Sequence, residues 1–333
     1  MFPYIIRRFL NLIPTFIGAT LLAFIISQLV PGDFLNTVRL NPDVRPETID
    51  RLETQFGLDK PWYQQYFLWM GNILRGDLGL SFDSNQPVVN LIRRPVMNSM
   101  VLVIFSIILL WAIAIPLGVY SAVRQYSLGD QVVSTLSYFG LAIPNFFFAL
   151  VIILGIFYLR SFTRETFGYN ELILPVAKMT SSDFQDLSSL AKVGDVLKHA
   201  IVPSFVVATA GIAGFTRVLR GQMLEFLSSD FIRTARAKGL GERSVTYKHA
   251  LRPALIPFIA GIGGLLPSLI GGAGLVEIVM AWPGITPRLL DAINRQDIYV
   301  VMGFLVISTF LLMIGNLISD LLLAVTDPRI RYN

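Results

Sequence analysis

The sequence predicts an all-helical integral membrane protein with six transmembrane helices. Hydrophobic residues make up 54% of the 333 residues and charged residues only 15%, whereas soluble domains carry roughly 25% charged residues. The charges are also clustered, so that six long stretches contain no Asp, Glu, Lys or Arg. Because a helix needs about 20 apolar residues to cross the hydrocarbon core of a bilayer, each stretch can form one span. A lipid bilayer is therefore the expected environment of this chain.

The six stretches follow one another along the whole chain. They cover residues 9–32, 95–123, 131–159, 199–216, 253–276 and 298–319. The first stretch resembles a secretory signal peptide in position, but its apolar run is too long and no small-x-small cleavage site follows it. It is therefore interpreted as a retained span. Proline lies within or at the edge of five of the six stretches, where neighbouring helices can satisfy the freed backbone groups.

Three regions are expected. Residues 1–32 form a cytosolic amino terminus and the first span, residues 33–98 an extracytoplasmic helical region, and residues 99–333 a core domain with the other five spans. Within the second region a helix is expected over residues 47–56, and the aromatic-rich segment Trp62–Leu74 is typical of a membrane–water interface. So few apolar residues cannot bury much of a core. A small lobe packed at the interface is therefore favoured over a ligand-binding domain.

The distribution of basic residues predicts the orientation. With a cytosolic amino terminus, the inner segments hold 13 basic and 6 acidic residues, a net charge of +7, and the outer segments hold 14 basic and 16 acidic residues, a net charge of −2. Since basic residues concentrate in cytoplasmic loops, both termini are expected to be cytosolic. The pI of about 9.5 reflects this surplus beside the spans. Nucleic acid is therefore not expected as a partner.

The most informative non-membrane segment is residues 217–253, on the predicted cytosolic side. Four apolar residues recur there every four positions and predict one stripe on one helix: Met223, Leu227, Phe231 and Ala235. Lys238 precedes Gly239, a pair that favours a helix carboxyl end. Glu242 favours the start of a second short helix. The segment is thus predicted to be a basic two-helix element. The outer segment 160–198 is interpreted as a loop with short helical pieces, without an assigned role.

The sequence lacks the motifs expected of a chain that binds nucleotide, holds a metal or catalyses a reaction. The chain has no G-x-x-x-x-G-K-[ST] phosphate loop, no cysteine and no H-E-x-x-H motif. His199 and His249 have no partners at metal-binding spacing and are interpreted as structural. Glu277 and Asp320 stand at the ends of spans and are interpreted as interfacial. Because proton- or sodium-driven carriers usually keep an ionisable residue inside their spans, energy is expected to enter from another subunit. A self-sufficient channel or secondary carrier is the alternative of another class.

Residues 234–240 read Thr234-Ala235-Arg236-Ala237-Lys238-Gly239-Leu240 and are followed by His249-Ala250-Leu251-Arg252. These residues resemble the cytosolic loop of ABC-importer permeases of the dipeptide, oligopeptide and nickel group. Further similar motifs occur in order at residues 31–33 (Pro-Gly-Asp), 57–61 (Gly-Leu-Asp-Lys-Pro), 76–79 (Gly-Asp-Leu-Gly), 282–284 (Trp-Pro-Gly) and 327–331 (Asp-Pro-Arg-Ile-Arg). The likeness covers essentially the whole chain, and the long outer region resembles that of the first of two permeases.

The resemblance implies the type I ABC importer permease fold and a set of partners. These are a second, non-identical permease, two cytosolic ATP-binding subunits and an extracytoplasmic substrate-binding protein, in a bacterial or archaeal plasma membrane. ATP and magnesium would be bound by the partner subunits, so that no cofactor, metal or catalytic residue is expected in this chain. The residues implied in ATPase coupling are Asp230, Phe231, Ile232, Arg233, Thr234, Ala235, Arg236, Ala237, Lys238, Gly239, Leu240, Glu242 and Arg243.

Within this segment, Phe231, Ile232 and Ala235 are expected to offer an apolar contact to the ATPase. Arg233, Arg236 and Lys238 are expected to offer charge. Compared with the general loop pattern of such permeases, the acidic residue and the final proline are replaced, so the same ion pairs with the ATPase are not assumed. The resemblance favours di- or oligopeptides as substrate. Nickel or its chelate, glutathione and oligosaccharides remain alternatives within the group, and the pathway-lining residues are not assigned.

Overall fold

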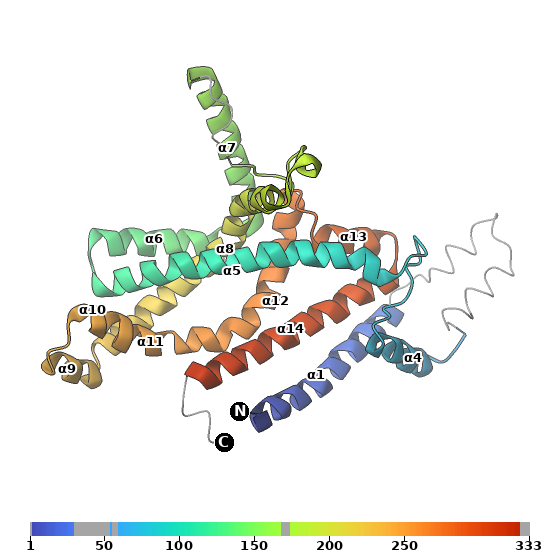
Figure 1. Cartoon of the computed structure of the whole chain (residues 1–333), viewed down its shortest axis with the longest axis horizontal. Coiled ribbons are helices and arrows are strands. Elements are labelled where there is room, and N and C mark those ends of the chain that lie inside the picture. Colours follow the sequence, from blue (N-terminus) through green and yellow to red (C-terminus); the bar gives the residue numbers. More distant parts are fainter. Residues whose placement is uncertain (1, 30–53, 55–58, 168–173, 327–333) are drawn as a thin grey trace. The chain divides into compact units, whose positions relative to one another are not determined.

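The computed structural model describes residues 2–29, 54, 59–167 and 174–326, with the side chains of residues 10–26, 28, 54, 59–166, 174–261 and 273–322. These residues are predominantly helical (Figure 1), and within them the one β feature is an isolated antiparallel bridge between Leu80 and Pro87. Apart from Thr54, the helix expected over residues 47–56 lies outside the described part of the chain, as do the motifs at residues 31–33 and 327–331.

The long helices coincide with the uncharged stretches. They are α1 (Phe2–Leu29), α5 (Val88–Val123), α6 (Leu128–Ala142), α7 (Asn145–Phe167), α8 (Ser189–Leu227), α12 (Ile256–Val279) and α14 (Ile298–Thr326). Of the described helices, four contain segments long and apolar enough to cross a membrane: Val88–Val123, Asn145–Thr166, Ser189–Leu227 and Ile298–Leu322. A shorter apolar stretch, Leu10–Ile26, lies within α1. The described residues of the six uncharged stretches are thus mostly helical, with breaks at residues 143–144 in the third stretch and at Leu255 in the fifth.

The described residues divide into two compact units. The first comprises residues 1–97 and 284–314. In it, the aromatic-rich segment Trp62–Leu74 forms helix α4, which packs against α1. The Tyr66 hydroxyl lies 3.1 Å from the Thr20 hydroxyl, and the Phe24 ring makes an edge contact with Tyr66 and a tilted contact with Trp69. Aromatic residues of this segment therefore attach α4 to α1, the helix of the first predicted span.

A second contact in this unit joins the 76–84 loop to the start of α14. Asp297 is buried and accepts hydrogen bonds from the Ser81 hydroxyl at 2.5 Å and the Phe82 amide at 3.2 Å. Gly79 has a φ of +89°, and a Cβ there would lie 2.9 Å from the Tyr299 ring. Glycine is required at this position for both reasons. The Gly76–Gly79 motif therefore serves a close approach of the loop to α14.

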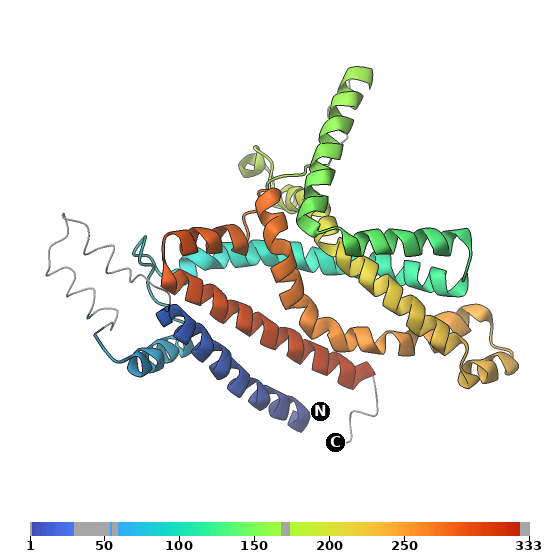
Figure 2. The same cartoon turned by 180° about the vertical axis from the view of Figure 1, so that it is seen from behind.

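The second unit comprises residues 98–283 and 315–333. In it, the third uncharged stretch is not one continuous helix as expected. Residues 131–159 are divided between α6 and α7, because Pro144 disfavours helical geometry at Ile143, which is extended with φ −90° and ψ 122°. α6 packs along α8, and the two helices lie side by side in Figures 1 and 2.

Two further expectations are corrected in this unit. The fourth uncharged stretch is the centre of α8, a helix of 39 residues that begins nine residues before Lys198, so much of the segment expected to be a loop is helical. Glu277, interpreted as interfacial, is 1% exposed and accepts a hydrogen bond from the Ser99 hydroxyl. Burial of this carboxylate beside Ser99 makes it part of the packing between α5 and α12.

Candidate functional site

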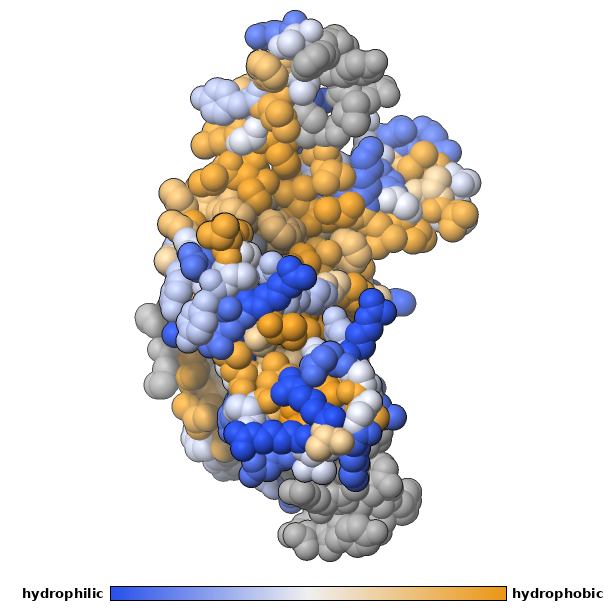
Figure 3. All heavy atoms as spheres, turned by 90° about the vertical axis from the view of Figure 1, so that its left-hand side faces the viewer, coloured by the Kyte–Doolittle hydropathy of each residue, from blue (hydrophilic) through white to orange (hydrophobic). Residues whose placement is uncertain are grey.

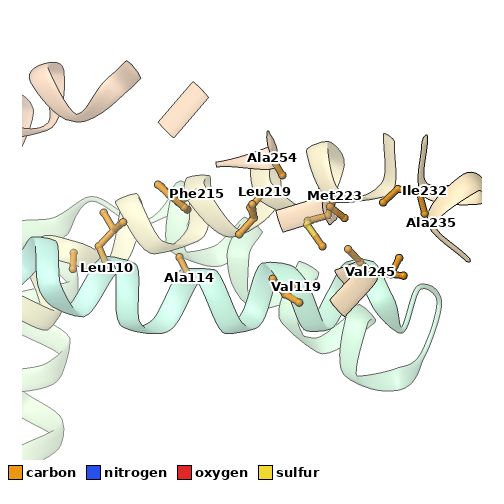
Figure 4. Packing of buried hydrophobic residues seen from close by; sticks show 13 residues of the cluster. Leu110, Ala114, Val119, Phe215, Leu219, Met223, Ile232, Ala235, Val245 and Ala254 are labelled. Atoms are coloured by element: carbon orange, nitrogen blue, oxygen red, sulfur yellow. The ribbon is translucent and has the colours of Figure 1, made fainter. Parts of the chain in front are cut away.

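The two-helix element predicted from the sequence is attached to a continuous apolar core (Figure 4). The buried side chains of this core come from α5, α8, α9 (Asp230–Ala237), η2 (Val245–Ala250) and α11 (Leu251–Ala254). Figure 4 shows Leu219 and Met223 of α8 above Ala114 and Val119 of α5, with Ile232 beyond them. The core thus extends without a break from the predicted spans to the residues implied in coupling.

The prediction of one helix carrying a single apolar stripe is wrong. α8 ends at Leu227, Ser228 caps it, and α9 begins only at Asp230 after the extended Ser229, with φ −74° and ψ 156°. Serine hydroxyls compete with helical hydrogen bonding, and the Ser228 hydroxyl donates to the Glu225 carbonyl at 2.8 Å. The four-residue spacing of apolar residues therefore spans two helices, with α9 set apart from α8 by this break.

Buried and exposed faces of α9 are sharply divided. Ile232 is 0% and Ala235 7% exposed, so the prediction that these two side chains offer a contact to a partner is wrong. Phe231 is 47% exposed and its ring lies 6.2 Å from that of Phe226 at the end of α8. Of the three apolar side chains expected to contact the ATPase, Phe231 alone is accessible. Ile232 and Ala235 instead fix α9 to its own core.

Gly239 ends α9 in the manner predicted. Its φ is +77°, its amide donates to the Arg236 carbonyl at 2.9 Å, and the Leu240 amide donates to the Ala235 carbonyl at 3.3 Å. These two bonds define a Schellman motif, which satisfies free carbonyls at a helix end. Lys238 immediately before the glycine is exposed, where its charge complements the carboxyl end of the helix.

An ion pair closes the turn between the two helices. Arg236 approaches Glu242, the first residue of α10 (Glu242–Ser244), through Nε–Oε1 at 2.8 Å and Nη2–Oε2 at 3.3 Å. Both side chains are largely exposed, at 43% and 69%, so the pair contributes little to stability but fixes the orientation of α10. Arg236 is therefore held by an internal partner.

The remaining polar residues of the predicted set surround this turn. Asp230 pairs with Arg233 at 3.3 Å, and its carbonyl accepts a hydrogen bond from the Thr234 hydroxyl. Ala237, Lys238, Leu240 and Arg243 are exposed. In the view onto the end of the unit that carries α9 and α10, hydrophilic residues lie around smaller apolar areas (Figure 3). The accessible face of α9 and the turn that follows it thus carries more basic than acidic side chains around the exposed Phe231 ring.

The second helix of the element is irregular. After α10, η2 is a π-helix whose Val245, Thr246 and Ala250 are buried. It continues into α11 and then, after Leu255, into α12. Wide π turns are rare and occur frequently at functional sites. Through this segment, residues 242–279 connect the α9 turn directly to the predicted fifth span.

One further contact, missed from the sequence, braces α8. Asp130 at the start of α6 is 3% exposed and forms a two-point ion pair with Arg220, Oδ1–Nε and Oδ2–Nη2 both at 2.8 Å. The Tyr126 amide also donates to this carboxylate at 2.9 Å. The hydrogen bond from Arg220 lowers the pKa of Asp130 to about 2. Because the two residues are 90 positions apart, no local pattern could reveal the pair.

Comparison with known proteins agrees with these features. Residues 114–332 match the family "Binding-protein-dependent transport system inner membrane component", and residues 1–101 match its amino-terminal counterpart. The chain is 40% identical to the oligopeptide transport system permease protein AppB of Bacillus subtilis, over 100% of both chains. It is 34% identical to the dipeptide transport system permease protein DppB of Escherichia coli K12, over 100% of this chain and 99% of the relative. The chain therefore belongs to the inner membrane components of binding-protein-dependent transport systems, which have the all-helical type I ABC permease fold.

Proposed function

We propose that this chain is a permease subunit of an ATP-driven importer of di- or oligopeptides. It forms half of the translocation pathway beside a second, non-identical permease, and both of its termini are cytosolic. Two ATP-binding subunits supply the energy and an extracytoplasmic binding protein delivers the peptide, in a bacterial or archaeal plasma membrane. The names of the relatives, which refer to oligopeptide and dipeptide transport, support peptides over nickel, glutathione or oligosaccharides.

The division of α9 into a buried and an exposed face supports the coupling role most directly. Its buried residues, Ile232 and Ala235, join a core that also contains residues of α5 and α8, so a force on α9 passes directly into long helices. Its outer face presents Phe231 with Arg233 and Lys238 nearby. An exposed ring surrounded by cations suits a cleft with an apolar pocket and an acidic rim. In this proposal the ATPase moves α9, and no reaction occurs on this chain.

The absence of cysteine from the sequence allows a direct test. A Phe231→Cys variant, purified with its transport partners, should be joined to an ATP-binding subunit by a short thiol-to-amine crosslinker, which links the introduced thiol to a nearby lysine, and crosslinking should abolish ATP-driven peptide uptake. The matched control is Leu190→Cys, 84% exposed near the opposite end of α8. It should react with a membrane-impermeant thiol reagent from outside and give no such crosslink. Recovery of the chain without an ATPase, or uptake that continues without ATP, would instead indicate a self-sufficient channel or carrier.

A further inference from the structure

A groove runs along the outside of the segment that joins the coupling element to the predicted fifth span. Its volume is about 430 Å³, and its lining residues are Tyr247, Lys248, Leu251, Arg252, Leu255 and Ile259. They come from η2, α11 and α12, with Leu255 at the junction between α11 and α12. Tyr247, Leu251, Leu255 and Ile259 are spaced four residues apart, so they follow one face of the helical segment. Lys248 and Arg252 form a parallel pair beside them.

The polarity of the groove changes along its length. At one end Tyr247, Lys248 and Arg252 are exposed, whereas Leu251, Leu255 and Ile259 towards the other end are half-buried. The lining contains no carboxylate, and the described residues include no acidic partner within ion-pair distance of either cation. The groove therefore has a cationic end and an apolar end, with no internal group to neutralise the charge.

The boundary of the predicted span falls within this groove. Arg252 is the last charged residue before the uncharged stretch 253–276, which places it at the level of lipid head groups. Ile259 lies seven residues further on, about 10 Å along a helix axis and inside the hydrocarbon layer. An occupant must therefore carry negative charge at the membrane surface and an apolar chain below it. This description fits an anionic phospholipid, since basic residues beside a span attract anionic lipids of the cytoplasmic leaflet.

We propose that this groove binds one anionic phospholipid. Its phosphate contacts Lys248 and Arg252 with the Tyr247 hydroxyl beside them, and one acyl chain lies along Leu251, Leu255 and Ile259. The bound lipid then contacts both η2, which follows the coupling turn, and α12, and so supports the link between them. The inference rests on the proposed membrane placement of Arg252.

Native mass spectrometry of the complete purified transporter tests this site with two added lipids. Phosphatidylglycerol should be retained over phosphatidylethanolamine by roughly tenfold or more, as expected for two basic groups at a membrane surface. The preference should disappear in a Lys248→Gln, Arg252→Gln variant. It should persist in the control Arg160→Gln, Arg164→Gln, which removes two exposed cations from α7. Ile259→Trp, which keeps both charges and fills the apolar end, should reduce retention of phosphatidylglycerol.

Other occupants give different results. Inorganic phosphate alone should not displace the lipid, and displacement would overturn the proposal in favour of a simple anion site. A photoreactive probe on a single Leu255→Cys residue should crosslink to lipid, whereas a crosslink to the second permease would assign the groove to the subunit interface. Equal retention of the two lipids by a transporter that still imports peptide would refute the lipid site alone. Normal lipid preference without ATP-driven uptake would instead refute the proposed function.

Discussion

Replacing Ile232 by alanine should release α9 from the core while leaving the membrane spans folded. α9 has eight residues, and helices shorter than about 12 residues are not stable in water without tertiary contacts. Its attachment to the core depends on Ile232, which is fully buried, and on Ala235, which is 7% exposed. Ile232 supplies most of the apolar area in this contact. The substitution therefore acts on the element that is proposed to receive force from the ATPase.

The magnitude follows from the size of the group removed. Ile232→Ala deletes three carbon atoms from a fully buried side chain, a loss of about 2.4 kcal/mol at about 0.8 kcal/mol per methylene group. The cavity left behind brings the expected cost into the range of about 2–5 kcal/mol. A value of about 3 kcal/mol would shift the equilibrium between attached and detached α9 by roughly 150-fold. Phe231→Ala, at an exposed neighbouring position, should change this equilibrium little.

Hydrogen exchange and transport measurements on the purified transporter check the prediction. In Ile232→Ala, the amides of residues 230–240 should exchange much faster, since local opening controls exchange, and ATP hydrolysis should no longer drive peptide uptake. In Phe231→Ala, exchange should remain slow while uptake is lost, because only the proposed ATPase contact is removed. If Ile232→Ala left both exchange and uptake unchanged, the burial of α9 would have no part in coupling.

Three further predictions concern the same region. Gly239→Ala should cost about 1–2 kcal/mol because its φ is +77°, whereas Gly241→Ala, at φ −63° with open space around it, should cost little; equal thermal shifts for the two would contradict the helix-end assignment. Arg236→Glu and Glu242→Arg should each lower the free energy of unfolding by about 1 kcal/mol or less and reduce ATP-driven uptake. The double exchange should restore uptake, and failure to do so would show that the ion pair has no part in coupling. Asp130 contributes about 2 kcal/mol, because its pKa falls from 3.8 to about 2 on folding. This stability is complete above about pH 4 and is lost as the pH falls towards 2, so unfolding by denaturant should show that dependence in the wild type and lose it in Asp130→Asn.

Local features of the coupling element could be predicted from the sequence. The Lys238–Gly239 pair correctly marked the end of α9, because a positive φ and a cation at a helix end depend only on neighbouring residues. The break at Ser228 was missed, since the apolar spacing continues across it with the same period of four. Packing against α5 and α8 determines which side chains of α9 face inward. Ile232 is buried and its neighbour Phe231 is exposed for this reason, and the sequence alone could not distinguish them.

Contacts between residues far apart in the sequence could not be predicted from one sequence. The six uncharged stretches correctly located the long helices, because length and apolarity alone identify spans. The third stretch nevertheless contains two helices, although Pro144 was visible as a place where a helix can bend. The ion pair of Asp130 with Arg220 and the burial of Glu277 required the fold, since each joins residues from different helices.

The length of α8 has a mechanical consequence. Its 39 residues correspond to about 58 Å at 1.5 Å per residue, nearly twice the thickness of a bilayer's hydrocarbon core. A helix of that length protrudes from the membrane at one end or both. If α8 tilts as a single rod, a rotation of about 5° displaces one tip by about 5 Å relative to the other. Small angular changes within the lipid would thus become displacements of about one helical turn at Leu227, next to α9. Conversely, a force applied near Leu227 would rotate α8 through only a small angle within the membrane.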